Sequence, residues 1–229
     1  MQNIPKLTKR MRAAADHVRA DAIVADVGTD HAYLPIALCM EGRARSCVAS
    51  DINEGPIMRA RAHIAEYGLE DRIETVLTDG LDKIERYRPT DVLILGMGGE
   101  LIADIISRAP FTMDSGIRLI LQPMTHPEVV RAFLLSNGYA IVGETVVSEE
   151  KIYQIICAEY AGDGSPAKAY SEVELLLGRL NIENKPPHFS ELVDRFITVF
   201  SERARGKRMA GANTDEEEKM LAQLEELKG

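Results

Sequence analysis

Short apolar runs alternate with segments of helical periodicity along the first two thirds of the chain. Five of these runs predict buried strands, at residues 23–25, 46–50, 72–77, 91–95 and 118–121. Helices are predicted between them over 33–40, 56–67 and 100–108, and from Pro127 to a stop at Gly138. Strands that alternate with helices in this way predict an α/β fold built on a parallel, doubly wound sheet.

Two further β-rich runs follow the last of these helices, at residues 140–147 and 151–160. Only Ser148, Glu149 and Glu150 separate them. A parallel connection needs a crossover of roughly a dozen residues or more, so these two runs must pair antiparallel. The sheet is therefore expected to end in a hairpin.

The composition changes at residues 161–168, a segment with two glycines, a serine and a proline that we interpret as a linker. The linker divides the chain into an expected sheet domain, residues 1–160, and an expected helical domain, residues 161–229. A first helix of the second domain is predicted over 171–180.

A helical hairpin is predicted at the end of the chain. Apolar residues at helical spacing indicate a long helix over 189–209. Thr214 and Glu217 have the spacing of a capping box that opens a last helix with a matching apolar stripe. Because the connection through Gly211 is short, the two helices should pack antiparallel.

Composition limits the function classes. The chain has 229 residues and a formal net charge of −9, so any nucleic-acid partner must be held by local basic clusters. Cys39, Cys47 and Cys157 are scattered without a C-x-x-C motif, and we expect core thiols in a reducing compartment and no metal site. The charged N-terminus is unlike a signal peptide, and no apolar run is long enough to span a bilayer. We therefore expect a cytoplasmic protein without a membrane partner.

Basic residues gather in two places despite the acidic total. One is an amphipathic helix predicted over residues 5–19, whose polar face also carries Arg19, and the other is the tip of the helical hairpin. Each cluster is either solvated surface or a contact for RNA phosphates, and the hairpin could serve only to stabilise the fold or a dimer. The candidate RNA-binding residues are Lys6, Lys9, Arg10, Arg12, Arg203, Arg205, Lys207 and Arg208.

The turn after the first predicted strand is the first candidate ligand site. Gly28 lets the backbone bend sharply and lets a ligand approach, as in the glycine-rich turns of dinucleotide folds. Here, however, Asp26 and Asp30 flank the place where a phosphate would lie, and they would repel an anion. The turn suits a ligand with an amino group, such as the amino-acid end of S-adenosylmethionine. The alternative is a structural turn with capping aspartates.

Acidic residues also follow the second and third strands. Asp51 lies near the ~20 residues after Gly28 at which an acid accepts the hydroxyls of an adenosine ribose. The alternative is a helix cap before Pro56. Asp79 could accept the amino group of an adenine. The glycines after the fourth strand, Gly96 to Gly99, indicate close approach of the backbone to a ligand or a helix.

The parallel sheet with its antiparallel hairpin is the pattern of class I methyltransferases. More specific strings then identify a resemblance: Leu7-Thr-Lys-Arg10, Asp26-Val-Gly-Thr-Asp-His-Ala-Tyr-Leu-Pro35, Ser50-Asp-Ile-Asn53, Thr78-Asp-Gly-Leu81, Gly96-Met-Gly-Gly99 and Leu121-Gln-Pro-Met124. In these strings and their order the chain resembles the bacterial tRNA (adenine-N1)-methyltransferase family that acts on adenosine 22 of tRNA, called TrmK. The C-terminal tail is similar to that family's helical appendage.

The resemblance implies S-adenosylmethionine as cofactor and tRNA as partner. It also implies which residues hold each part of the cofactor. The methionine end would be lined by Asp26, Gly28, Thr29, Asp30 and His31, the ribose by Asp51 and Ile52, the adenine by Asp79 and Gly80, and the sulfonium side by Gly96, Met97 and Gly98.

The chain departs from the general methyltransferase pattern in two ways. Its first motif has one glycine, Gly28, and its fourth strand is followed by Gly96 to Gly99 in place of the Asp/Asn-Pro-Pro-Tyr motif of amino-methylating enzymes. This favours methylation of the ring nitrogen N1, whose lone pair lies in the plane of the base. The expected mechanism is then mainly positional, with no obligatory general base.

Asp30 and His31 are the candidate catalytic residues. Asp30 would stabilise the cationic product base, and His31 would orient it or handle a proton. Both could instead be cofactor ligands only. Two other functions stay open on the sequence: a small-molecule methyltransferase, and a non-catalytic RNA-binding module with a vestigial nucleotide fold. A monomer is expected, although the oligomeric state is left open.

Overall fold

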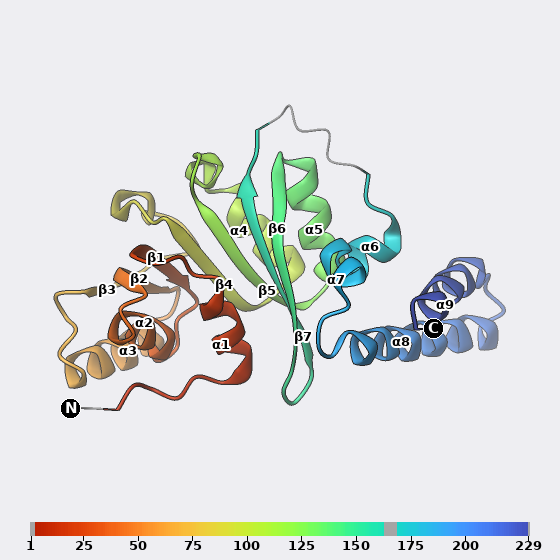
Figure 1. Cartoon of the computed structure of the whole chain (residues 1–229), viewed down its shortest axis with the longest axis horizontal. Coiled ribbons are helices and arrows are strands. Elements are labelled where there is room, and N and C mark those ends of the chain that lie inside the picture. The colour runs from red at the N-terminus through yellow and green to blue at the C-terminus, as the bar shows by residue number, and fades with distance from the viewer. Residues whose placement is uncertain (1–2, 163–168, 229) are drawn as a thin grey trace.

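A seven-stranded mixed sheet forms the centre of the computed structural model, which describes residues 3–162 and 169–228 (Figure 1). The strands run in the order β3-β2-β1-β4-β5-β7-β6. The first five are parallel, and β7 pairs antiparallel with both β5 and β6. Their bounds are β1 Ala22–Val27, β2 Ala44–Asp51, β3 Ile73–Leu77, β4 Asp91–Gly98, β5 Arg118–Thr125, β6 Tyr139–Ser148 and β7 Ile152–Tyr160.

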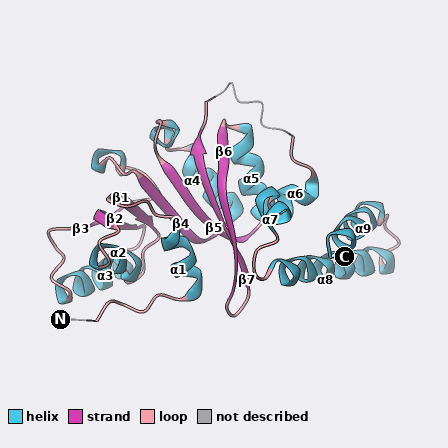
Figure 2. Ribbon diagram, viewed as in Figure 1, coloured by secondary structure: helices cyan, strands magenta, loops and turns pink. Residues whose placement is uncertain are grey.

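Helices cover both faces of this sheet (Figure 2). Val92 and Ile94 of β4 belong to the core between the sheet and helices α4 and α5. Leu93 between them belongs to the core on the opposite face, with α1, α2 and α3. This alternation follows from the two-residue period of a strand that is buried on both faces. The helices are α1 Lys9–Asp16, α2 Tyr33–Met40, α3 Glu54–Glu66, α4 Gly99–Ser107 and α5 Pro127–Ser136, with short 3-10 turns η1 Glu85–Tyr87 and η2 Pro110–Met113.

The predicted fold class is confirmed, including the antiparallel hairpin of β6 and β7. The helix predicted over residues 5–19 is too long, because α1 begins after its N-cap Thr8 and ends at Asp16. The alternative interpretation of Asp51 as a helix cap is wrong: Asn53 is the N-cap of α3, which begins before Pro56. The three cysteines are buried and free, as expected.

The C-terminal helices form a separate layer beside β6 and β7. The single helix predicted over 171–180 is two helices, because Gly178 takes a φ of +89° between them. A side chain at Gly178 would also collide with the Glu144 carboxylate. The helices are α6 Glu172–Leu177, α7 Arg179–Asn184, α8 Phe189–Met209 and α9 Asp215–Lys228.

The α8–α9 hairpin projects away from the sheet, and its two helices lie side by side (Figure 1). Glu217 does not form the predicted capping box with Thr214. Its carboxylate pairs with Lys207 at 2.7 Å, and the Thr214 hydroxyl donates to Glu218 at 2.8 Å. Most of the predicted linker, residues 163–168, lies outside the described residues, and the division into two domains stays a prediction.

A buried ion pair fastens this layer to the sheet. Arg131 of α5 and Glu144 of β6 are both fully buried, and their side chains meet at 2.7 Å. Arg131 also donates to the backbone carbonyl of Leu175 in α6 at 2.8 Å, and Glu144 accepts from the backbone N–H of Leu180 in α7 at 3.0 Å. One charge pair therefore holds α6 and α7 against α5 and β6.

No helix among residues 3–162 and 169–228 is both long and apolar enough to cross a membrane. In the same residues, no cluster of His, Cys, Asp and Glu side chains has the arrangement of a metal site.

Candidate functional site

The carboxyl ends of β1, β2, β3 and β4 meet at one edge of the sheet, and Asp26 lies at its centre. Asp26 is only 7% exposed. Burial raises the pKa of its carboxyl to about 6, a hydrogen bond with the Thr29 side chain lowers that pKa, and the nearby Asp51 charge raises it. Because burial disfavours the ionised form of this carboxyl, a bound cation would stabilise it.

The turn after Asp26 has the shape expected of a ligand cradle. Gly28 takes a φ of +79°, and a Cβ there would lie 2.5 Å from the Met97 Cε atom. The backbone N–H groups of Gly28 and Thr29 both donate to the carbonyl of Ser50, at 2.8 and 2.9 Å. The turn therefore joins the ends of β1, β2 and β4, and its positive φ at Gly28 favours glycine there.

Asp30 and His31 lie on the rim of this edge. The Asp30 carboxylate pairs with Arg59 of α3 and lies 3.2 Å from His31 Nε2, and its side chain is 64% exposed. His31, Tyr33 and His63 pack their rings nearly parallel, with centroids 5.1 to 5.3 Å apart. Arg59 thus offsets part of the Asp30 negative charge, which was predicted to stabilise the cationic product base. His31 belongs to an aromatic cluster.

Asp51 and Asp79 follow the ends of β2 and β3. The Asp51 carboxylate accepts from the backbone N–H of Asn53 at 2.8 Å, which orients it at the mouth of the edge. Ile52 beside it is 62% exposed, an unusual position for an apolar side chain. The Asp79 carboxylate lies 3.4 Å from the guanidinium of Arg108, the C-cap of α4, and Gly80 beside it takes a φ of +54°. The two acids are therefore neighbours along one rim.

The end of β4 opens the other side of the site. Gly96 takes a φ of +80°, and the register of β4 with β5 is irregular from Leu95 to Gly98. A Cβ at Gly96 would lie 3.4 Å from an Arg10 nitrogen, and one at Gly98 would lie 3.3 Å from Thr125 Oγ1. Gly99 could carry no side chain at all, because the backbone of His126 fills that space. Both predicted reasons for these glycines therefore apply: Gly96 leaves the edge open to a ligand, and Gly99 allows close packing of α4 against the loop at His126.

Three arginines of the predicted basic face have hydrogen-bonding or ion-pair partners within the protein. The Arg10 guanidinium points to the end of β5, where it donates to Gln122 Oε1 at 2.7 Å and lies 5.3 Å from the Tyr153 ring centroid. Arg12 pairs with Glu41 at 2.7 Å. Arg19 pairs with the fully buried Asp91 at 3.0 Å.

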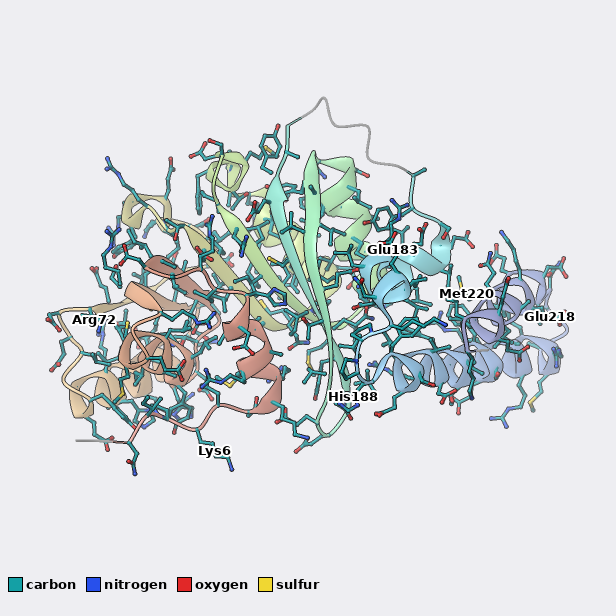
Figure 3. The ribbon with its side chains drawn as sticks, viewed as in Figure 1. Lys6, Arg72, Glu183, His188, Glu218 and Met220 are labelled. Carbon is teal, nitrogen blue, oxygen red and sulfur yellow. The ribbon has the colours of Figure 1, made fainter. Side chains whose placement is uncertain are left out.

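Lys6 and Lys9 are the exposed members of this first cluster. Figure 3 shows Lys6 pointing away from the body of the molecule. The structure thus divides the predicted basic face into two exposed lysines and three arginines with internal partners.

The basic tip of the hairpin is partly neutralised. Lys207 pairs with Glu217, and Arg208 pairs with Glu218 at 3.0 Å, both in the acidic first turn of α9. Arg203 instead lies 5.1 Å from the centroid of the Phe200 ring. Arg203 and Arg205 have no ion pair with a carboxylate within the described residues. The four residues of this cluster are therefore not equivalent.

Sequence reasoning did not identify Arg59, Arg108 or Gln122 as site residues. Arg59 and Arg108 lie on helix surfaces, where an isolated arginine looks like solvated surface. Gln122 carried a signal, because it is a polar residue at the end of a buried strand, and it is 0% exposed here. All three contact residues that the sequence did identify.

The edge as a whole presents a defined set of groups to a ligand. It offers a buried carboxylate for a cation, a rim carboxylate for hydroxyls, a second rim carboxylate for an amino group, and a side-chain-free opening at Gly96. The donor set fits a nucleoside that carries an amino-acid chain. It suits binding and alignment of two molecules better than proton transfer, since the described residues of the edge include no buried histidine–carboxylate pair.

Comparisons with known proteins agree with this chemistry. The model of a methyltransferase domain family matches residues 7–156. The tRNA (adenine(22)-N(1))-methyltransferase of Bacillus subtilis (strain 168) is 35% identical over 176 residues, which cover 76% of this chain and 73% of that protein.

Solved structures extend the likeness over the helical layer. That of the B. subtilis m1A22 tRNA methyltransferase TrmK superposes with a TM-score of 0.82 at 28% identity and covers 98% of this chain and 96% of that chain. A proposed tRNA (m1A22) methyltransferase of Streptococcus pneumoniae, in complex with S-adenosyl-L-methionine, gives a TM-score of 0.85 at 27% identity and covers 98% and 100% of the two chains.

Proposed function

Because this chain belongs to the tRNA (adenine(22)-N(1))-methyltransferase family, we propose that it methylates N1 of adenosine 22 in tRNA with S-adenosylmethionine as the methyl donor. The enzyme would act in the cytoplasm, where its substrate is found. The observation that carries the proposal is Asp26, a buried carboxylate with a raised pKa at the centre of an edge whose other groups match the same cofactor.

Each part of the cofactor has a group in this chain that suits it. Asp26 would pair with the methionine amino group, and the turn at Gly28 and Thr29 would lie against the methionine chain. Asp51 would accept the ribose hydroxyls beside the exposed Ile52. Asp79 and Gly80 would lie at the adenine, with Arg108 holding the Asp79 carboxylate in place. Gly96, Met97 and Gly98 would border the sulfonium.

The bound cofactor supplies an activated methyl group, and the work of the protein is alignment. The adenine ring would approach edge-on at the exposed Gly96, beside the hydrogen-bonded side chains of Arg10 and Gln122. Holding two reactants in line accounts for a large part of such an acceleration, up to about 7 to 11 kcal/mol in model reactions. N1 carries its own lone pair, so no residue has to remove a proton before transfer.

Asp30 and His31 are assigned supporting roles. Methylation leaves the base cationic, and the Asp30 carboxylate on the rim would favour that charge even though Arg59 shares it. His31 packs against both Tyr33 and His63, so we assign it to orientation of the base or cofactor.

The test is incubation of unmodified tRNA with S-adenosylmethionine labelled in the methyl group, followed by digestion and nucleoside analysis. We expect label in 1-methyladenosine only. The matched control is the same transcript with guanosine in place of adenosine 22, which should accept no label. Label in N6-methyladenosine, or methylation of free adenosine offered in place of tRNA, would contradict the proposal.

A further inference from the structure

A groove of about 530 Å³ separates the sheet from the C-terminal helices. On the sheet side it is lined by residues 123–128, the end of β5 and the start of α5. On the other side it is lined by α6, α8 and α9, including Phe200, Arg203 and Met220. Met220 lies on the sheet side of the α8–α9 hairpin (Figure 3). None of the residues of the cofactor edge lines this groove, so it is a second concave site.

The groove begins next to the place of methyl transfer. In the pairing of β4 with β5, Met97 lies opposite Pro123 and Gly98 lies opposite Thr125. One strand spacing, roughly 5 Å, therefore separates the opening at Gly96–Gly98 from the first residues of the groove. An RNA strand that presents one base at β4 has its neighbouring nucleotide within reach of this lining.

The lining has the chemistry of a nucleotide subsite. Phe200 is half-buried, so one part of its ring is accessible from the groove, and Met124 and Met220 provide further apolar surface. The Arg203 guanidinium lies 5.1 Å from the Phe200 centroid. Within the described residues, no carboxylate lies within ion-pair distance of Arg203, unlike Lys207 and Arg208, although the Arg203 charge helps to lower the pKa of the nearby Glu217 carboxyl. A flat ring beside an available cation suits a stacked base and its phosphate.

Carboxylates complete the lining and restrict what can bind. Four carboxylates line the groove: Glu128, Glu172, Glu216 and Glu217. Glu128 lies against His126 and Glu217 pairs with Lys207, whereas Glu172 and Glu216 each have a lysine Nζ only at 4.0 Å. They would repel a run of phosphates. They would accept hydrogen bonds from the amino or imino edge of a single base. The occupant that satisfies ring, guanidinium and carboxylates together is one unstacked nucleotide.

We propose that this groove binds the nucleotide adjacent to the target adenosine of tRNA, with its base on Phe200 and its phosphate at Arg203. The inference rests on the proposed function, and it gives the helical layer a direct part in placing the target. Extrusion of the target from its helix would be favoured because the neighbouring base gains a stacking partner.

Two variants and a matched control test the groove. Phe200→Leu keeps apolar bulk but removes the flat ring, and Arg203→Gln removes the charge. Ser201→Ala is the control, because Ser201 is exposed on the same helix, does not line the groove and is not one of the candidate RNA-binding residues. We expect the KM for tRNA to rise about tenfold in Phe200→Leu and severalfold in Arg203→Gln, as stacking and phosphate contacts predict. The Kd for S-adenosylmethionine should stay unchanged in all three, and the control should behave as wild type.

A second measurement locates the nucleotide directly. A tRNA transcript with a photoreactive base analogue on either side of adenosine 22 is irradiated with the wild-type protein, and the linked peptide is identified. Links to residues 123–128 or to α8 support the groove. Links confined to other segments, or an unchanged KM in both groove variants, overturn it. Methyl transfer by the wild type is measured with labelled S-adenosylmethionine. If the wild type transfers no methyl group to tRNA, the proposed function is overturned. If it transfers normally and both groove variants keep the wild-type KM, only the groove proposal is overturned.

Discussion

Two buried carboxylates in this protein have opposite surroundings. Glu144 is fully buried against Arg131, and backbone groups of α6 and α7 complete its surroundings and those of its partner. Asp26 is almost as buried, yet its pKa is raised to about 6, because burial outweighs the one hydrogen bond from Thr29 and the Asp51 charge adds to the effect. The described residues give Asp26 no cationic partner.

The difference separates a structural charge from a functional one. A buried ion is stable when a counterion and hydrogen bonds compensate for lost hydration, as they do for Glu144. Where compensation is missing, the folded protein carries a free-energy penalty, of about 3 kcal/mol for a pKa shift of this size. A bound cation would relieve that penalty. The first carboxylate holds two layers together, and the second is ready for a ligand.

Removing one partner of the structural pair should have the largest effect. Arg131→Met leaves Glu144 buried without its cation, and we expect the free energy of unfolding to fall by about 3 to 5 kcal/mol, measured by urea denaturation. The double variant Arg131→Met with Glu144→Leu should recover most of this loss. A single variant as stable as wild type would mean that water reaches Glu144 and that the pair does not fasten the helical layer.

Neutralising Asp26 should not lower the free energy of unfolding, in contrast to the loss of Arg131. Asp26→Asn removes the penalty, so the unfolding free energy at neutral pH should stay equal or increase, by up to about 3 kcal/mol. The Kd for S-adenosylmethionine, measured by calorimetry, should rise roughly tenfold to a hundredfold as a charged hydrogen bond is lost. Asp51→Asn is the comparison at the rim, where binding should weaken without a gain in stability. A destabilised Asp26→Asn protein with normal affinity would make Asp26 structural.

The pKa of Asp26 also predicts a pH dependence. The folded-state pKa lies above that of an unfolded chain, so this group stabilises the fold at low pH, and its contribution is lost as the pH rises through about 6. Cofactor binding should have the opposite sign, because the ionised form pairs with the amino group. We expect the affinity for S-adenosylmethionine to fall by up to tenfold for each pH unit below about 6. Asp26→Asn should abolish both trends, and a wild-type affinity that is flat between about pH 5 and 7 would contradict them.

The smallest effect is expected at the hairpin tip. Lys207 and Arg208 already have carboxylate partners, so replacing both by Gln should weaken tRNA binding less than about threefold at physiological salt. It should leave the salt dependence of binding nearly unchanged. Filter binding across a salt series measures both quantities. A large loss of affinity would show that these pairs open on RNA and that the tip is a main contact after all.

Much of the architecture could be predicted because it depends on local patterns. The apolar runs and the helical periodicity between them predict the parallel strands, and the short Ser148–Glu150 connection requires the final hairpin. Since parallel strands bring their carboxyl ends to one edge, the sequence alone predicts that acids at the ends of three successive strands lie together. The candidate site at Asp26, Asp51 and Asp79 follows from that rule.

Only the tertiary structure decided which charges are free. Arg10, Arg12 and Arg19 have the same helical pattern as solvated residues, yet Arg10 reaches Gln122, which is more than a hundred residues away in the chain. The pairing of Lys207 with Glu217 and the groove between β5 and α8 likewise depend on how distant elements pack. Periodicity states which residues share a face, and the sequence by itself therefore determined the elements and the acidic edge. What lies opposite each face is set by long-range packing, so the fold alone decided where a cation is neutralised, where one stays available, and where a carboxylate lacks its partner.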